Sequence, residues 1–494
     1  MRYATRPGDD SWTSAFIETA YQLFRSAGNT AVVREYWPQI KLHLRRLAAA
    51  AEADASSWPP TLYGDWVPPS FPPGAHQQCN PSNRPDCVFP LARPFTSAYS
   101  WIMNLQRSAE MATAIGDGAM AAEIRSNLTR LTARFNAEWL RPNGTYDTGI
   151  QTTFALPLQL GIVPNNSRAA VAKSFLSSVQ AARLHFTTGD IGAKAFFPAL
   201  SSIGRDDVAV AVLERTDYPS FGFMRYNTLE PATSNMWELM DSPFQGHGMN
   251  SRNHHMWSAV SAYLLESVAG LSQRSSSGFA EVIMAPGAMP GNGGGGVAAA
   301  AASLSLSHGN VSVSWRWSGG DICGTAADGA ELALQCGAGG GVITDVRHAS
   351  YGTPEGKCGS FEAGECDHPA ALRAISSLCV GRNACTVRVG ASELGAAAES
   401  CAPFGHAQRL HVQLACSEPA AMEVNARVPV GSVAALELPV AAHHTALVLD
   451  AREQLWQRRN FVAGGLPKGV QHVHAEGDAL SVRLGSGGYS FRLS

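Results

Sequence analysis

The sequence has little charge and no strongly basic region. Charged residues make up 16% of its 494 residues, and the formal net charge is −3. A nucleic-acid-binding surface needs Lys and Arg gathered on one face, so this composition argues against that class of partner. No run of about 20 apolar residues occurs either, and a membrane-spanning helix is therefore not expected.

The N-terminus also lacks a secretion signal. It reads MRYATRPGDDSW and contains no apolar stretch of the kind that a signal peptide requires. Four sequons nevertheless begin at Asn127, Asn143, Asn165 and Asn310, and together with the cysteines they favour an oxidising compartment. We therefore expect a secreted or extracellular protein, cell wall included, whose natural start lies before residue 1.

No CxxC pair occurs among the ten cysteines, which argues against a zinc site. Cys79 and Cys87 lie in a Pro-rich loop, and the other eight fall between Cys323 and Cys416. An even, clustered set predicts a disulfide framework, and a set of reduced buried thiols is the alternative. The histidines lack metal-ligand spacing, so we expect no metal and no cofactor, although calcium held by loop carboxylates stays open.

Residues 1–272 are predicted to be mainly helical. The segment WTSAFIETAYQLFRSAG places Ala15, Thr19, Leu23 and Phe24 on one helical face and stops at Gly28. Further helical segments follow in neighbouring pairs, and NHHMWSAVSAYLLESVAGL is the last. About nine helices in such pairs are typical of an α/α hairpin toroid, of which they would form an incomplete part.

From residue 278 onward the sequence changes to Gly-rich turns and alternating strands. AASLSLSHGNVSVSWRW alternates apolar and polar residues, and the same texture returns after the Cys block in ALSVRLGSGGYSFRL. We predict one antiparallel β-sandwich formed by 278–320 and 417–494, into which a disulfide-rich α/β domain, 321–416, is inserted. A tandem order of three domains is the alternative.

Five short motifs occur one after another along the helical part. They are DDSW (9–12), YGDWVPP (63–69), HFTTGDIGAKAFFPAL (185–200), MWE (236–238) and GMNSRNHHMWSAV (248–260). Together they resemble the catalytic domain of the α-L-rhamnosidases, glycoside hydrolase family 78. The resemblance implies an (α/α)6 toroid with a C-terminal sandwich. It also implies inverting hydrolysis of terminal α-L-rhamnosyl residues in plant or algal glycans or glycosides.

The Cys block carries motifs of a second family: LQCGAGGGVITDVRHASYGTPEGKCGSFEAGEC, CVGRNAC and RLHVQLAC. They resemble the sea-urchin-egg-type (SUEL) galactose/rhamnose-binding lectin domain in the variant found in plant β-galactosidases. The resemblance implies the bridges Cys323–Cys358, Cys336–Cys416, Cys366–Cys401 and Cys379–Cys385. It makes Tyr351 the candidate contact for galactose or rhamnose. Gly324 stands where binding members have an acidic residue, and a stapled spacer domain is therefore the alternative role.

Glycoside hydrolysis normally uses two carboxyl groups. In an inverting enzyme one protonates the leaving oxygen, and the other, about 6.5–9.5 Å away, deprotonates a water molecule. The resemblance assigns the general base to Glu238, for which a surface or helix-capping role is the alternative.

The motif that carries the family's general acid, D-x-P-x-R-x-E-R-x-G-W-x-G-D, does not occur in the sequence. We therefore expect that acid upstream of Met1. Asp241 is too close to Glu238 to lie across a sugar ring from it. No sequence feature favours the remaining acids as replacements: Asp9, Asp10, Asp65, Asp190 and Glu230.

Four further residues are candidate sugar contacts by their position in the motifs. His254 matches the family's sugar-contacting histidine, and Trp12 and Trp66 match aromatic residues that line the rhamnose pocket. Asp65 is predicted to accept hydrogen bonds from sugar hydroxyls. The alternatives are a structural histidine, two core tryptophans and an aspartate that only fixes its loop, and Asp190 is predicted to have such a loop role.

Three functions follow from this pattern. The first is an inverting α-L-rhamnosidase with Glu238 as base. The second is a non-catalytic protein that binds rhamnose-containing carbohydrate. The third is an inactive truncated fragment, whose open barrel would expose apolar surface.

Overall fold

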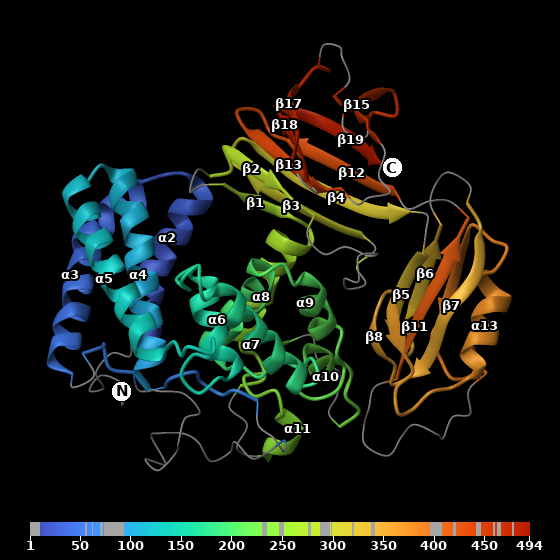
Figure 1. Cartoon of the computed structure of the whole chain (residues 1–494), viewed down its shortest axis with the longest axis horizontal. Coiled ribbons are helices and arrows are strands. Elements are labelled where there is room, and N and C mark those ends of the chain that lie inside the picture. The colour runs from blue at the N-terminus through green and yellow to red at the C-terminus, as the bar shows by residue number, and fades with distance from the viewer. Residues whose placement is uncertain are drawn as a thin grey trace. The chain divides into compact units, whose positions relative to one another are not determined.

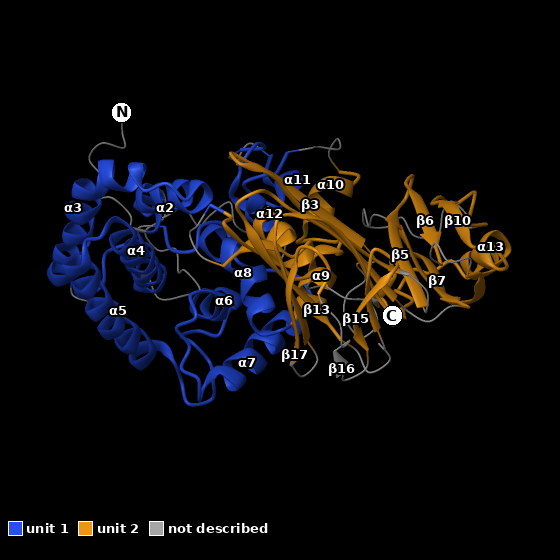
Figure 2. Ribbon diagram, turned by 90° about the horizontal axis from the view of Figure 1, so that it is seen from above, with its two compact units in different colours: residues 1–204, 235–260, 275–278 blue, residues 205–234, 261–274, 279–494 orange. Residues whose placement is uncertain are grey.

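The structure is a computed structural model. It describes residues 10–54, 57–61, 63–69, 73, 93–229, 235–246, 251–274, 278–286, 297, 299–318, 321–336, 341–395, 408–417, 421–440, 446–457, 460–461, 466–476 and 479–494. The chain divides into two compact units, coloured in Figure 2. The first unit comprises residues 1–204, 235–260 and 275–278, and the second comprises 205–234, 261–274 and 279–494.

Helical hairpins build the first unit (Figure 1). The helices of the chain are α1 (Asp10–Thr13), α2 (Ala15–Ala27), α3 (Ala31–Ala53), α4 (Arg93–Ile115), α5 (Gly118–Trp139), α6 (Gln151–Gln159), α7 (Arg168–Ala181), α8 (Asp190–Ser202), α9 (Asp206–Leu213), α10 (Phe221–Tyr226), α11 (Ser242–Gln245), α12 (Val260–Tyr263) and α13 (Ala370–Cys379). Helix α2 packs against α3 and α4, α4 packs against α5, and α6 packs against α7 and α8. Helix α6 is the most enclosed of these, with eight consecutive buried residues from Gln151 to Leu158.

The buried face of α2 differs from the prediction. Ile17, Ala20, Tyr21 and Phe24 are buried, whereas Ala15, Thr19 and Leu23 are exposed. Both sides of α2 carry apolar residues, so periodicity alone did not decide between them. The buried side is the one whose Tyr21 hydroxyl donates a hydrogen bond to Glu110 Oε2 of α4 at 2.9 Å. As predicted, the helix ends at Gly28, which adopts φ 65° and donates its N–H to the Phe24 carbonyl.

The last predicted helix of the toroid changes its geometry along its length. Met256–Ala259 form a 3-10 turn, α12 follows, and Leu264–Val268 form a π-helical turn. In the wider turn the Ala269 N–H bonds to the Leu264 carbonyl. The Val268 carbonyl accepts a hydrogen bond from the Trp315 indole at 3.1 Å. The change in winding thus leads the chain into the β-sandwich.

Two sheets form the sandwich of the second unit. One has the strand order β1-β2-β13-β18-β17 and the other β16-β15-β14-β19-β12-β4-β3. Buried residues from both sheets form one core, including Leu436, Trp315 and Phe491. The strands are β1 (Leu271–Gln273), β2 (Glu281–Met284), β3 (Ala299–Leu306), β4 (Gly309–Ser318), β12 (Ala421–Val428), β13 (Val433–Pro439), β14 (Ala446–Leu449), β15 (Glu453–Gln457), β16 (Asn460–Phe461), β17 (Val470–Glu476), β18 (Ala479–Leu484) and β19 (Gly487–Leu493).

One strand pair of the sandwich departs from the antiparallel prediction. Strands β13 and β2 pair in parallel, with Leu436 opposite Met284. A parallel pair needs a long crossover connection, and here the chain between β2 and β13 passes through the other sheet.

Residues between β4 and β12 form sheets of their own. The orders are β5-β11-β7, β10-β6 and β8-β9, and α13 packs on β7 and β10. Ser318 at the end of β4 is the register partner of Ala421 at the start of β12, so this segment leaves and re-enters the large sheet at one point. Its strands are β5 (Asp321–Ala327), β6 (Glu331–Gln335), β7 (Ile343–Gly352), β8 (Glu355–Lys357), β9 (Ser360–Glu362), β10 (Ala384–Arg388) and β11 (Arg409–Cys416).

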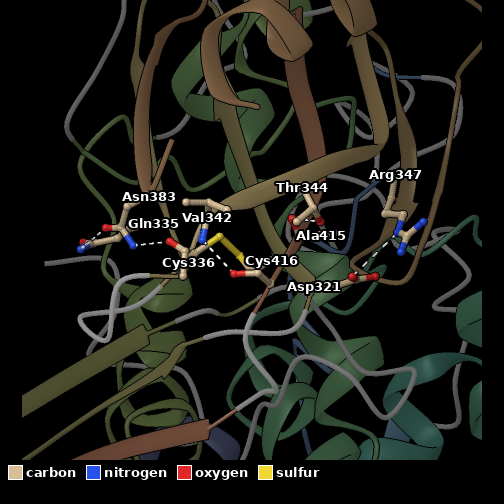
Figure 3. Close-up of a disulfide and its surroundings, with 11 residues drawn as sticks. Asp321, Gln335, Cys336, Val342, Thr344, Arg347, Asn383, Ala415 and Cys416 are labelled. Carbon is tan, nitrogen blue, oxygen red and sulfur yellow. Dashed lines mark hydrogen bonds and ion pairs between the residues drawn. A yellow bond between two sulfur atoms is a disulfide. The ribbon is translucent and has the colours of Figure 1, made fainter. Parts of the chain in front are cut away.

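Three of the four predicted bridges are present. They are Cys323–Cys358, Cys336–Cys416 and Cys379–Cys385. Figure 3 shows Cys336–Cys416, which ties the end of β6 to the end of β11. Beside it the Val342 N–H donates to Ser417 Oγ at 3.0 Å. The fourth predicted bridge involves Cys401, which, like Cys79 and Cys87, lies outside the described residues.

Candidate active site

Two of the quoted motifs lie side by side at Glu238. The Glu238 N–H donates to the Ser251 carbonyl at 2.8 Å, and the His254 N–H donates to the Met236 carbonyl at 2.9 Å. These backbone bonds join the MWE segment to the segment that carries His254 and His255. Trp237, between Met236 and Glu238, is fully buried and anchors the pair to the core. The predicted base and the predicted sugar-contacting histidine therefore lie on two neighbouring backbone segments.

Trp66 contacts the predicted base directly. Its indole Nε1–H donates to Glu238 Oε1 at 3.0 Å, across 172 residues of sequence. A hydrogen bond to a carboxylate is stronger than one between neutral groups, and it fixes the orientation of the acceptor. Trp66 and Glu238 are both half-buried. The structure thus brings together two residues that were assigned separately, one as a pocket wall and one as a base.

A row of aromatic rings continues from Trp66. Tyr63 meets Trp66 edge-on with ring centroids 5.4 Å apart, and Trp12 meets Tyr63 edge-on at 5.8 Å. Trp12 is 37% exposed, so it is not the core residue that was its alternative role. Tyr63 was missed by the sequence reasoning, although it belongs to the same YGDW motif as Trp66. Aromatic faces of this kind suit the apolar side of a deoxy sugar.

Asp65, which precedes Trp66 in the chain, is buried, and its carboxylate caps the first turn of α8. It is 2% exposed. The Gly189 and Gly192 N–H groups each donate a hydrogen bond to its carboxylate at 2.8 Å. The Thr152 hydroxyl donates a third hydrogen bond to the same carboxylate. Burial raises the pKa of Asp65, and these hydrogen bonds act in the opposite direction. Of the two roles foreseen for Asp65, the geometry favours fixing the loop over contacting sugar.

Asp190, the first residue of α8, belongs to the site although it was predicted to have only a loop role. Its N–H donates to the Trp66 carbonyl at 2.8 Å. Burial raises the pKa of Asp190 to about 6, and the Asp65 and Glu238 charges add to the rise. Lys194 and His255 act against it. A carboxyl group with this pKa exchanges its proton in mildly acidic solution, where an ordinary aspartate is ionised.

Lys194 lies one turn after Asp190 in the interior of the helical unit. Burial lowers the pKa of the Lys194 ammonium, and its neighbours Glu18 and Asp190 oppose that effect. Its Nζ is 3.7 Å from Met103 Sδ and 5.6 Å from the Tyr99 ring centroid. The half-buried Lys194 thus lies against side chains of α4.

The two histidines of the NSRNHH segment stack on each other, with ring centroids 5.4 Å apart and planes 13° apart. His254 Nδ1 accepts a hydrogen bond from the Met256 N–H at 3.4 Å, so a neutral His254 carries its proton on Nε2. His254 is half-buried and His255 is exposed. A half-buried Nε2–H beside Glu238 suits a contact to a sugar hydroxyl.

Asp241, another acid considered from the sequence, has a structural role. Asp241 is buried, and its Oδ2 accepts a hydrogen bond from Gln245 Nε2 at 2.8 Å, which stabilises α11. Asp9 and Glu230 lie outside the described residues, as does the side chain of Asp10.

In the disulfide-rich region the predicted ligand residue is enclosed. Tyr351 is 0% exposed, and its hydroxyl donates to Asp328 Oδ1 at 2.6 Å. A Cβ on Gly324 would lie 2.7 Å from Leu332 Cδ1, so an acidic side chain could not replace this glycine without repacking the core. Contact between Tyr351 and a sugar stays a prediction, and this geometry favours the spacer alternative.

Two kinds of feature are absent from the described ranges. Within these ranges no three His, Cys, Asp or Glu side chains are grouped so as to hold a metal ion. None of the helices in the part of the chain that is described has both the length and the apolar character needed to span a bilayer.

Two family models match the sequence. The bacterial alpha-L-rhamnosidase 6 hairpin glycosidase domain matches residues 4–268. The D-galactoside/L-rhamnose binding SUEL lectin domain matches residues 334–416. Both predicted resemblances are confirmed, and so is the predicted class of fold, a helical six-hairpin domain followed by antiparallel sheets with disulfides.

Similar proteins are known in bacteria and plants. An alpha-L-rhamnosidase of Streptomyces avermitilis is 26% identical over 284 residues, which are 56% of this chain and 25% of that protein. One of Alteromonas sp. is 24% identical over 279 residues, 56% of this chain and 29% of that protein. Beta-galactosidase 6 of Oryza sativa subsp. japonica is 38% identical over 89 residues, 18% of this chain and 10% of that protein.

Solved structures share the fold. The alpha-L-rhamnosidase from Dictyoglumus thermophilum matches with a TM-score of 0.65 and 19% identity, over 100% of this chain and 40% of that one. The Streptomyces avermitilis enzyme complexed with L-rhamnose matches with a TM-score of 0.60 and 18% identity, over 96% of this chain and 32% of that one. The chain thus spans between a quarter and two fifths of the length of these rhamnosidases. Since the six-hairpin model covers more than half of its residues, the chain belongs to the bacterial alpha-L-rhamnosidase six-hairpin glycosidase family.

Proposed function

We propose that the protein takes part in the hydrolysis of terminal α-L-rhamnosyl residues of plant or algal glycans or glycosides, with inversion and with Glu238 as general base. The observation that carries the proposal is the hydrogen bond from Trp66 Nε1 to Glu238 Oε1, because it orients a carboxylate beside an aromatic row and His254. In this proposal the Glu238 carboxylate, oriented by the indole, accepts the proton of the attacking water.

The general acid is the second part of the proposal. The motif that carries it in the family does not occur among the 494 residues. We propose that this acid belongs to polypeptide outside them. A leaving group as stable as p-nitrophenolate departs with little protonation, whereas an alkoxide needs an acid. The chain by itself is then expected to hydrolyse an activated aryl rhamnoside and to fail on an alkyl rhamnoside.

The test compares p-nitrophenyl and methyl α-L-rhamnosides with the purified chain. We expect release of p-nitrophenol that disappears in Glu238→Gln and persists in Asp147→Asn, a control in a turn where φ is 43° and Asn is well tolerated. Proton NMR of the first sugar released should show the inverted anomer. Hydrolysis that survives Glu238→Gln, or a retained anomer, would refute the role of Glu238.

A second candidate function is carbohydrate binding by residues 321–416. It is supported by the lectin-model match over 334–416. Titration of the Glu238→Gln variant with L-rhamnose and with D-galactose tests it, since sugar bound outside the hydrolytic site survives that substitution. Loss of binding in Tyr351→Phe would support the predicted contact, and absence of any second binding event would favour the spacer role.

We also propose a secreted or extracellular location. The three described bridges, Cys323–Cys358, Cys336–Cys416 and Cys379–Cys385, support it, because disulfides persist in oxidising compartments. Immunodetection in culture medium and cell-wall fractions of the source organism tests it, and an intracellular, reduced protein would contradict it.

A further inference from the structure

We propose that the first turn of α8 is the positioning element of the candidate site: it holds Trp66 against Glu238 and places the Asp190 carboxyl among the charges of Asp65, Glu238 and Lys194. This inference rests on the proposed function, because it deepens the role of the same site. It concerns a group that acts through Glu238 and Trp66 rather than through contact with the sugar.

Trp66 joins the start of α8 to the base by two hydrogen bonds. At its backbone, the carbonyl accepts from the Asp190 N–H at 2.8 Å. At its side chain, the indole donates to Glu238 Oε1 at 3.0 Å. A displacement of the first turn of α8 therefore moves Trp66, and with it the oxygen of the base that the indole holds.

The buried carboxylate of Asp65 locks this turn in place. It accepts hydrogen bonds from the N–H groups of Gly189 and Gly192, on either side of Asp190. The close approach requires glycine, since a Cβ on Gly189 would lie 2.4 Å from the Trp66 carbonyl oxygen. Loop 63–66 and the start of α8 are thus held together as one rigid support.

Charged groups from four segments surround the Asp190 carboxyl. Asp65 comes from loop 63–66, Glu238 from the MWE segment, Lys194 from the next turn of α8, and His255 from the segment before Met256. The two acids disfavour an ionised Asp190, whereas Lys194 and His255 favour it. Lys194 is in turn influenced by Glu18 of α2 and Arg107 of α4.

This environment gives the site a charge that changes in mildly acidic solution. Burial and the nearby acids raise the pKa of Asp190 to about 6. Below that pH Asp190 is neutral, and above it a negative charge lies within electrostatic range of Glu238. Ionisation of Asp190 therefore changes the electrostatic field at the hydrolytic site over this pH range.

The direct test is a pH titration of the aspartate side-chain carboxyls by carbon NMR on the full chain. The Asp190 signal is identified by its loss in Asp190→Asn, and its midpoint is expected near 6. Glu238→Gln should lower this midpoint and Lys194→Met should raise it. Lys194→Arg should restore the midpoint, and Asp147→Asn should leave it unchanged.

The NMR titration does not depend on hydrolysis. It can therefore test the role of Asp190 even if the chain proves inactive and the proposed function fails. If Asp190 only completes the first turn of α8, its midpoint will be the same in Glu238→Gln and in the parent protein, and the inference is overturned. Where the chain hydrolyses p-nitrophenyl α-L-rhamnoside, kcat/KM should also show an inflection near the Asp190 midpoint that is lost in Asp190→Asn. An inflection that persists in this variant likewise overturns the inference.

Discussion

Replacing Asp190 with Asn should stabilise the helical unit at neutral pH. The pKa of Asp190 is raised from its ordinary value of 3.8 to about 6. An aspartate with a raised pKa stabilises the folded state only while it is protonated, and this contribution is lost as the pH rises through the interval between the two values. Asn is neutral at every pH and therefore avoids the loss.

The magnitude follows from the shift. A pKa raised by about 2 corresponds to about 3 kcal/mol at 25 °C, so Asp190→Asn should raise the free energy of unfolding by about that amount at about pH 7.5. The gain should fall to about half of this at about pH 5 and nearly vanish at about pH 4. A gain of about 3 kcal/mol is a large fraction of the stability of an ordinary domain.

The assay is thermal and urea unfolding of the parent chain and the variant, followed by the circular dichroism of the helices, at each of these pH values. Only the difference between the two proteins is interpreted, because other groups titrate in both. Asp147→Asn serves as the control and should show no gain that grows with pH. A gain that is equal at all pH values, or a loss at neutral pH, would show that Asp190 ionises freely in the folded protein.

Further changes test the support of the site and the stability of the insert. Trp66→Phe removes the indole donor to Glu238, and the loss of a hydrogen bond to a charged group, about 1.5–3 kcal/mol, should reduce kcat/KM for p-nitrophenyl α-L-rhamnoside roughly 10- to 100-fold. Gly189→Ala forces a Cβ to within 2.4 Å of the Trp66 carbonyl oxygen, and should lower the thermal midpoint. Gly118→Ala, where nothing lies within 4 Å, should not. Removal of Cys336–Cys416, with a sequence separation of 80, should destabilise the insert by about 4–5 kcal/mol, and removal of Cys379–Cys385, with a separation of 6, by about 2 kcal/mol in urea unfolding.

Local patterns predicted much of the fold because they report local physics. Period-two alternation identified β3 and β4 as a strand pair, which is what the structure contains. The spacing of the cysteines indicated the disulfide framework, while its pairing came from the resemblance. The burial of α2 was misjudged because both of its sides are apolar, and only packing against α3 and α4 decides which side is covered. The parallel pairing of β2 with β13 depends on a distant crossover that no local pattern records.

The site was predicted where its residues belong to a motif and missed where their role depends on burial. Glu238, Trp66 and His254 lie in short specific motifs, and the structure brings them together. Nothing in the sequence shows that Asp65 is 2% exposed and has its hydrogen bonds inside the protein. Asp190 was passed over for the same reason, since its pKa follows from desolvation and from charges that are distant in sequence.

The register partners at the entry and exit of the insert have a consequence for the order of folding. Before the insert folds, pairing β4 with β12 means closing a loop of about 100 residues, at an entropic cost of about 4 kcal/mol. Inside the insert Asp321 is paired with Ala415, so folding of β5 against β11 brings both ends of the segment together. The folded insert then holds β4 and β12 next to each other, as the turn of a short hairpin would. The strand pair that is most distant in sequence within this sheet thereby becomes a local contact, and local contacts form faster.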